Sequence, residues 1–169
     1  YISVDKSLIE TWSERLGPKT DFRVGLVWAG NPEHKNDHNR SIDLVLFRPL
    51  TEVKGVSFYS LQVGREEDVE GLLGEGVTEL GAHLTDFAET AAAIECLDLV
   101  ISVDTAVAHV AGALGKPVWV LLPHVPDWRW LLDRDDSPWY PTLRLFRQVQ
   151  PGDWADVVEN VINELRLVA

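Results

Sequence analysis

Four residues near the middle of the chain combine types and spacing suited to binding an anion. Asp104, Thr105 and Ala106 lie where an apolar run gives way to a helical pattern, and His109 follows one turn later on the same face as Thr105. A helix amino-terminus presents unpaired N–H groups and a positive dipole end, so a phosphate fits there without a basic side chain. The alternative is that Asp104 only caps the helix and His109 is a partly buried structural histidine.

A second candidate site is the long polar loop over residues 31–41. Gly30 allows a backbone to approach a ligand closely, and Arg40 is a cation in a chain that is otherwise acidic. An anion can be held there, although a solvated loop with local Asn and Asp turns fits the composition equally well. His34 and His38 have no evident third ligand, so we expect no metal site.

A third candidate is the aromatic loop over residues 123–141, which reads Pro-His-Val-Pro-Asp-Trp-Arg-Trp and later Ser-Pro-Trp-Tyr-Pro. Its tryptophans, Trp128 among them, can stack on a base or line a sugar site, with Arg129 as an anion contact. They can equally form a private core under the loop. Long structured loops at strand ends are more often functional, which favours the first interpretation.

The elements that position these segments alternate between strands and helices. We predict strands at 23–28, 56–61, 77–80, 98–103, 118–122 and 143–146, and helices at 5–16, 44–53, 65–73, 86–97, 105–114 and 153–166. The apolar strands favour a Rossmann-like three-layer α/β/α sandwich with a mostly parallel sheet of about six strands. Ligands of such sheets bind beyond the carboxyl ends of the strands, where all three candidate segments fall.

Composition limits the function classes. A length of 169 residues predicts one domain, over residues 21–169, preceded by a leading helix and linker over residues 1–20. A net charge of −12 opposes a nucleic-acid or anionic-membrane surface, and no apolar run is long enough to cross a bilayer. The lone Cys96 fits a reducing compartment, so we expect a cytoplasmic protein. Because the sequence contains no methionine and starts at Tyr1, we expect it to be a piece of a longer protein.

Several of these segments together resemble a known family. Residues 98–118, Asp-Leu-Val-Ile-Ser-Val-Asp-Thr-Ala-Val-Ala-His-Val-Ala-Gly-Ala-Leu-Gly-Lys-Pro-Val, resemble the nucleotide-sugar signature of the heptosyltransferase-like glycosyltransferases, family nine, of GT-B architecture. The loop from Trp28-Ala-Gly-Asn-Pro to Arg40-Ser41, with Trp128-Arg-Trp and Trp139-Tyr-Pro, resembles a bacterial subgroup often attached to tetratricopeptide repeats. The resemblance covers most of residues 23–161. This sequence departs from the family at residue 106, where many members have glycine. The side chain of Ala106 narrows the turn.

The resemblance implies that the chain is the carboxyl-terminal, donor-binding half of a GT-B enzyme. It implies a set of contacts with a nucleotide-diphosphate sugar: the diphosphate at Asp104, Thr105 and Ala106, the ribose or phosphate at His109, the phosphates or sugar at Gly30 and Asn31, a charge partner in Arg40, and the base along the loop that contains His83, Leu84 and Asp86.

The implied reaction is metal-independent, inverting sugar transfer. Negative charge grows on the distal phosphate as the glycosidic bond breaks, and N–H donors plus a cation stabilise it, so no metal or cofactor is expected. The resemblance places the acceptor and the base in a missing amino-terminal half, so no catalytic residue is assigned here and the chain alone should not transfer sugar. Two alternatives remain: a non-catalytic binding or scaffold module of the same fold, and a nucleotide-sugar epimerase, for which we find no convincing pair of flanking carboxylates.

Overall fold

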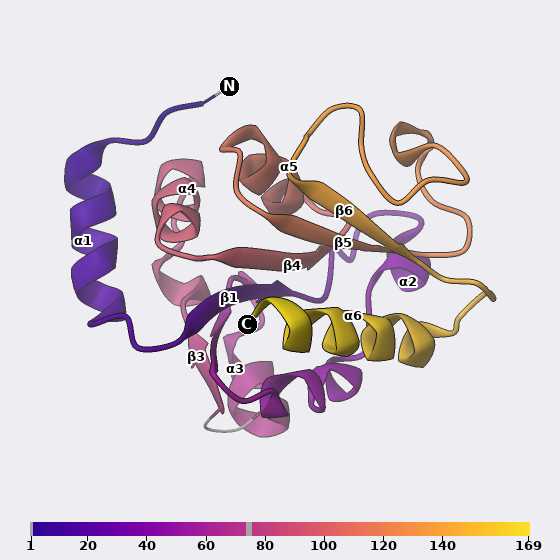
Figure 1. Ribbon diagram of the computed structural model, residues 1–169, viewed down its shortest axis with the longest axis horizontal. Coiled ribbons are helices and arrows are strands. Elements are labelled where there is room, and N and C mark those ends of the chain that lie inside the picture. The colour runs from indigo at the N-terminus through magenta and orange to yellow at the C-terminus, as the bar shows by residue number, and fades with distance from the viewer. Residues whose placement is uncertain (1, 74–75) are drawn as a thin grey trace.

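A six-stranded parallel sheet forms the centre of the molecule in a computed structural model that describes residues 2–73 and 76–169 (Figure 1). The strands are β1 (Phe22–Val27), β2 (Val56–Ser60), β3 (Val77–Glu79), β4 (Leu99–Val103), β5 (Val118–Leu122) and β6 (Leu143–Arg147). They lie in the order β3-β2-β1-β4-β5-β6, and every pairing between these described strands is parallel. The predicted fold class is confirmed.

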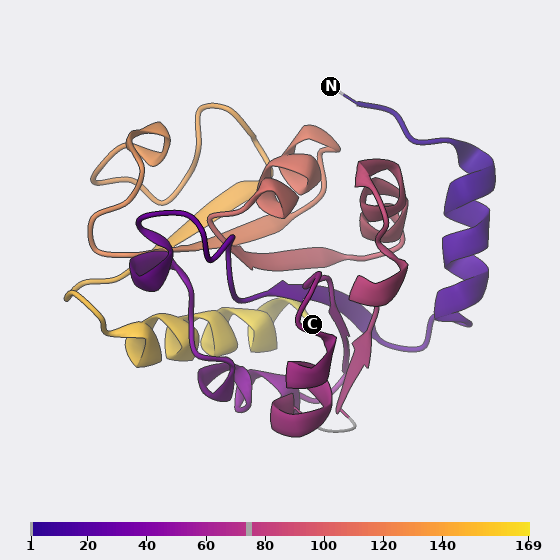
Figure 2. The same cartoon turned by 180° about the vertical axis from the view of Figure 1, so that it is seen from behind.

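Helices cover both faces of this sheet. The α-helices of the described residues are α1 (Lys6–Leu16), α2 (Asp37–Arg40), α3 (Glu66–Asp68), α4 (Phe87–Glu95), α5 (Ala106–Ala113) and α6 (Trp154–Val168). Figures 1 and 2 show α4 and α5 over one face and α6 over the other, with α1 outside α4. Side chains of a strand alternate between faces, so Leu26 packs in the apolar cluster with α6 and Val27 packs in the cluster with α4 and α5. Among the described residues no helix is long and apolar enough to cross a membrane.

The strand order creates a crevice at one edge of the sheet. The chain winds from β1 outward to β2 and β3, and then returns to place β4 on the other side of β1. The loops after β1 and β4 therefore leave the sheet in opposite directions at its carboxyl edge. In open α/β sheets such a switch point is where ligands bind.

The leading helix is tied to the body of the domain. Asp5 begins α1 by accepting a hydrogen bond from the backbone N–H of Ser7 (2.8 Å). The side chain of Trp12 is only 1% exposed, and its Nε1 donates to the Glu89 carboxylate on α4 over 2.6 Å. The α1 helix thus contributes a large side chain to the core on the α4 face.

Of two predicted helices, the one at 44–53 was wrong in kind, and the one at 65–73 is present but not as a regular α-helix. The helix expected at 44–53 is two 3-10 turns, Leu44–Phe47 and Leu50–Glu52, because Pro49 lies between them and has no N–H to continue a helix. The helix expected at 65–73 is the short α3 followed by a π-helical turn over Val69–Leu73. Gly74, the glycine that follows this predicted helix in the sequence, lies outside the described residues.

Candidate functional site

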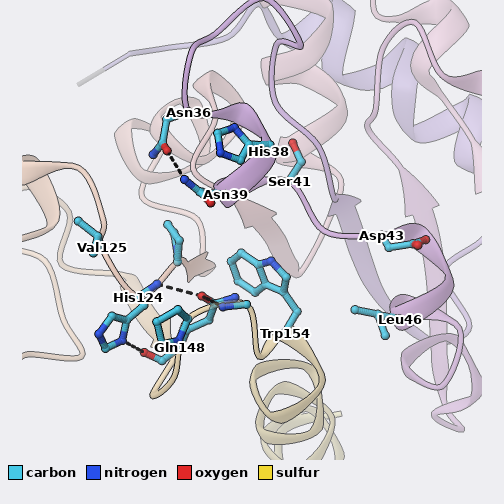
Figure 3. Close-up of a pocket in the computed structure, with 13 residues that line it drawn as sticks. Asn36, His38, Asn39, Ser41, Asp43, Leu46, His124, Val125, Gln148 and Trp154 are labelled. Carbon is cyan, nitrogen blue, oxygen red and sulfur yellow. Dashed lines mark hydrogen bonds between the residues drawn. The ribbon is translucent and has the colours of Figure 1, made fainter.

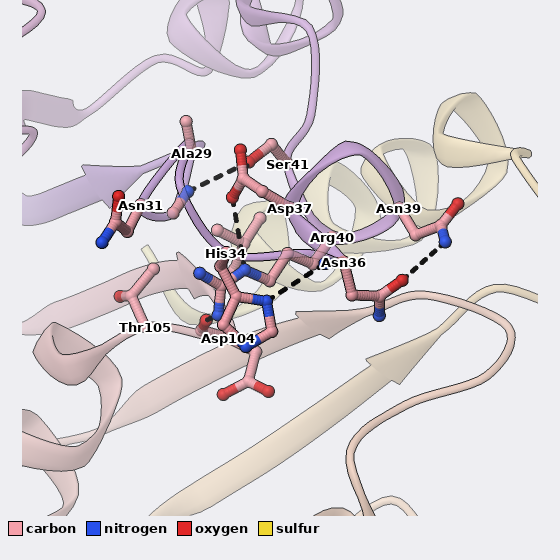
Figure 4. Close-up of polar contacts among 12 residues, drawn as sticks. Ala29, Asn31, His34, Asn36, Asp37, Asn39, Arg40, Ser41, Asp104 and Thr105 are labelled. Atoms are coloured by element: carbon pink, nitrogen blue, oxygen red, sulfur yellow. Dashed lines mark hydrogen bonds and ion pairs between the residues drawn. The ribbon is translucent and has the colours of Figure 1, made fainter.

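Arg40 bridges the loops that leave β1 and β4. The loop after β1 contains a single helical turn, α2, at whose end the Arg40 side chain turns back toward the sheet (Figure 4). Its Nη1 donates to the backbone carbonyl of Asp104 over 3.1 Å, and its Nε donates to the Asp37 carboxylate over 3.3 Å. The guanidinium also lies against Gly30, where a Cβ atom would be only 2.5 Å from Nη2. The predicted cation is therefore fixed at the switch point.

Buried polar groups hold this loop in place. Asp37, which is 9% exposed, also accepts a hydrogen bond from the Ser41 hydroxyl (2.9 Å). The Ser41 hydroxyl oxygen in turn accepts a hydrogen bond from the N–H of Gly30 (3.0 Å). The buried Gln62 amide accepts from the N–H of Ala29 and donates to its carbonyl, both over 3.1 Å. A hydrogen-bonded support of this kind positions a charged group more firmly than a solvated loop does.

The amino-terminus of α5 carries no side-chain cap from the described residues. Thr105 is the N-cap residue, and its hydroxyl lies 3.0 Å from that of Ser102 instead of on the helix N–H groups. Because the Ser102 hydroxyl donates to the Val103 carbonyl over 2.7 Å, the Thr105 hydroxyl is left to donate to Ser102. Asp104 does not cap the helix either. The first-turn amides, including that of the exposed Ala106, are therefore the donors offered to a ligand.

These groups face one open cavity of about 490 Å³, a volume typical of small-molecule sites. The cavity brings together five residues that the sequence singled out: Gly30, Asn31, Arg40, Thr105 and Ala106.

The residues after β2 form the wall of this cavity that sequence reasoning missed. Gln62 and Arg65 line it, and Arg65 adds a second cation. The signal was available, because residues 62–65 follow a predicted strand and the carboxyl ends of parallel strands meet at one edge.

Arg129 and Asp104 lie in a smaller neighbouring cavity of about 160 Å³, which Arg40 also lines. The Arg129 Nε donates to the Asp127 carboxylate over 2.8 Å, and this hydrogen bond lowers the pKa of Asp127 below its usual value. Trp128, beside it, is 76% exposed and lines neither of these two cavities. The aromatic loop therefore contributes Arg129, and not Trp128, to the lining of these cavities.

His109 packs behind the site, not in it. Its ring stacks on Trp130 at a centroid distance of 5.3 Å, and its Nδ1 lies 3.1 Å from the Tyr140 hydroxyl. Burial lowers the pKa of His109 below its usual value, even though the Asp104 carboxylate 3.9 Å away acts in the opposite direction. The surroundings of the ring therefore favour the neutral imidazole over an ion pair with Asp104.

The segment implied to hold the base lies elsewhere. Leu84 is buried in the core on the α4 face, and the Asp86 carboxylate accepts from the N–H of Glu89 (2.8 Å) as the N-cap of α4. His83 is exposed, and none of the three lines either cavity at the switch point.

The described residues contain no group of three or more metal-ligating side chains. His34 instead uses its Nδ1 to accept from the N–H of Asn36 over 3.2 Å.

Comparison with known structures places this geometry in a known fold. The chain superimposes on E. coli ADP-heptose lps heptosyltransferase II with a TM-score of 0.72 and 13% identity, covering 99% of this chain and 52% of that one. It superimposes on the glycosyl transferase family 9 protein from Veillonella parvula DSM 2008 with a TM-score of 0.70 and 14% identity, covering 100% and 54%. The fold is that of about half a heptosyltransferase.

Sequence comparison agrees over the central units. The model of glycosyltransferase family 9 (heptosyltransferase) matches residues 65–122. These residues run from Arg65, which lines the cavity, through β4 and α5 to the end of β5. Protein FlbA of Caulobacter vibrioides is 29% identical over 98% of this chain. The chain spans 29% of that relative and about half of each heptosyltransferase structure.

Proposed function

We propose that the cavity between β1 and β4 binds the diphosphate of a nucleotide-diphosphate sugar, and that the chain is the donor-binding part of a glycosyltransferase. The observation that carries this proposal is the position of Arg40, which is anchored by Asp37 and held beside the uncapped start of α5. In a domain of net charge −12, these groups concentrate positive potential at one place. Residues 21–169 supply this site, and residues 1–20 are an attached helix and linker.

The chemistry follows from the charge of the leaving group. As the bond from the sugar to the distal phosphate breaks, the phosphate oxygens gain negative charge. The N–H groups at Ala106 and Val107 and the Arg40 guanidinium are already oriented, so they stabilise that charge without reorganising. This set of donors supports inverting transfer without a metal, with Asn31 and Arg65 as further contacts on the cavity wall.

A second domain completes the enzyme in this proposal. We assign the base that deprotonates the acceptor to an amino-terminal domain, since the solved transferases are about twice the length of this chain. We therefore expect this chain, like the bacterial subgroup often attached to tetratricopeptide repeats, to bind the donor in the cytoplasm and to need an amino-terminal domain for transfer.

The test is calorimetric titration of the chain with UDP, GDP, ADP and CDP. At least one should bind, and Arg40→Ala should weaken it by about 10- to 100-fold, since a hydrogen bond to a charged group contributes about 1.5–3 kcal/mol. Arg48→Ala removes an exposed arginine outside the cavity and should change nothing. Absence of heat with all four nucleotides, or equal affinity in both variants, would contradict the proposal.

A scaffold module is the second candidate, favoured by one specific observation. The aromatic loop leaves large apolar side chains in solvent: Val125 and Trp128 are about three-quarters exposed and Leu132 is 71% exposed. Such groups mark protein contacts when they gather in one patch. The same titration decides between the candidates, because a scaffold that has lost donor binding gives no response to any nucleotide.

A further inference from the structure

A second cavity opens on the same edge of the sheet, between the loop after β1, the loops after β5 and β6, and the start of α6. Its volume is about 530 Å³, and Figure 3 shows its polar lining. Its wall is formed from residues the diphosphate site does not use, among them His38, Asn39, Asp43, His124, Gln148 and Trp154.

The Gln148 side chain carries an unused donor in this cavity. It is 5% exposed, and its Oε1 accepts from the N–H of His124 (3.0 Å) and from the N–H of Gly152 (3.2 Å). Two backbone donors fix which end of the amide is oxygen, so the NH₂ group lies on the opposite side, toward Trp154 in Figure 3. This buried Nε2 has no acceptor among the described residues. An oxygen atom of a ligand would satisfy it.

The other polar groups disfavour an anion as that ligand. Asp43 places a carboxylate on the wall, and the Asp153 carboxylate already caps the start of α6 by accepting from the N–H of Asp156 (3.2 Å). The lining otherwise mixes amides and imidazoles with the indole of Trp154. Vicinal hydroxyls both donate and accept hydrogen bonds, and the C–H face of a sugar ring packs on an aromatic surface.

We propose that this cavity binds a neutral sugar ring, with Gln148 and Asn39 contacting hydroxyl oxygens and Trp154 packing beside the ring. The site is separate from the diphosphate site and does not depend on the proposed function. A small third cavity adjoins both sites, because Asn36 lines it together with this cavity and Arg40 lines it together with the diphosphate cavity. A sugar held here would lie along the same edge as the proposed donor.

The experiment is a titration of the ¹⁵N-labelled chain with the methyl glycosides of glucose, galactose and mannose and with N-acetylglucosamine, followed by amide and indole resonances. At least one sugar should shift the side-chain NH₂ pair of Gln148 and the indole N–H of Trp154 at millimolar concentration. Gln148→Glu keeps an oxygen that accepts from the N–H groups of His124 and Gly152 but removes the NH₂ donor, and Asn39→Ala removes a second contact. Each should weaken binding by about tenfold, as expected for one lost hydrogen bond, while Asn160→Ala on the exposed side of α6 should leave it unchanged.

Three outcomes would overturn the inference. One is that no sugar shifts these resonances in the unaltered chain, a result that does not depend on any variant folding. Another is that inorganic phosphate shifts them and the sugars do not. The third is that Gln148→Glu and Asn39→Ala bind the sugar as well as Asn160→Ala does. A nucleoside diphosphate that shifts the residues around Arg40 while every sugar fails would leave the proposed function intact and remove this inference alone.

Discussion

Arg40 can lie against the backbone of the β1 loop because residue 30 has no side chain. An alanine Cβ at Gly30 would be 2.5 Å from Nη2 and 2.7 Å from Cζ of Arg40. The Gly30→Ala chain should still fold, because the far end of a long side chain is what has to move. It should bind the best nucleoside diphosphate about tenfold more weakly, which corresponds to about 1.4 kcal/mol, as measured by calorimetry.

Gly71→Ala is the matched control for this change. A Cβ atom there would meet nothing within 4 Å, and residue 71 lies outside both cavities at the switch point. Its affinity should equal that of the unaltered chain. If Gly30→Ala binds as tightly as Gly71→Ala, the guanidinium does not contact the ligand from the position described here.

At the scale of elements, the start of α5 is the part of the site that the backbone supplies. Ala106 is the first helical residue, and proline is tolerated at that position because its missing N–H would have no partner inside the helix. Thr105, at φ −137° and ψ 169°, already has the extended conformation required before proline. Ala106→Pro should therefore remove one donor from the cavity without unfolding the helix.

We expect Ala106→Pro to weaken diphosphate binding by about 10- to 100-fold in calorimetric titration, the cost of a hydrogen bond to a charged group. Ala106→Ser retains the N–H and should bind nearly as well as the unaltered chain. Equal affinity of the proline and serine variants would mean that this amide does not contact the ligand. Circular dichroism on both variants checks that the helices are retained.

The α1 helix is an element whose attachment to the domain can be measured. Trp12 is almost fully buried and hydrogen-bonded to Glu89, so Trp12→Ala should lower the free energy of unfolding by about 3–5 kcal/mol. In a domain of this size that corresponds to a fall in Tm of roughly 10 °C, measured by calorimetry. Thr11→Ala, on the exposed side of the helix, should change Tm little. Similar Tm values for the two variants would show that the domain is stable without α1.

At the scale of the whole molecule, the strands and the edge of the sheet that holds the site could be predicted, each from a different signal. The apolar runs predict the strands because strands covered on both faces need apolar residues at successive positions. The position of Arg40 could not be predicted, since it depends on α2, a single turn with no apolar periodicity, and on a contact with Asp104 across 64 positions of the chain. The role of His109 was also hidden, because helical spacing shows which face it shares with Thr105 but not that Trp130 and Tyr140 cover that face.

The site as a whole supplies its positive charge from amides and arginines. Diphosphate affinity should therefore be the same, within about twofold, in EDTA and in magnesium chloride, once the binding of magnesium to the free nucleotide is taken into account. Calorimetric titration in the two buffers measures this. Binding that disappears in EDTA and returns with the metal would contradict the metal-independent part of the proposed function.

The stability of the whole domain should depend on pH through His109. Burial lowers the pKa of this imidazole in the folded chain below the value of 6.5 that it has in model compounds. As pH falls through about 6.5, the unfolded chain therefore takes up a proton more readily than the folded one, and the free energy of unfolding decreases. The decrease ends once the pH is below the folded pKa, where both states are protonated, and the full stability is present above the unfolded pKa.

Urea unfolding at a series of pH values from about 8 to about 5 measures this dependence. His109→Gln cannot titrate, so its stability should fall less over that range than the stability of the unaltered chain, whatever the absolute cost of losing the stack on Trp130. His83→Gln, which removes an exposed histidine, should keep the original slope. If His109→Gln and the unaltered chain have the same slope, the imidazole behind the site is as readily protonated in the folded chain as in the unfolded one. Burial in the folded chain would then not lower the pKa of His109.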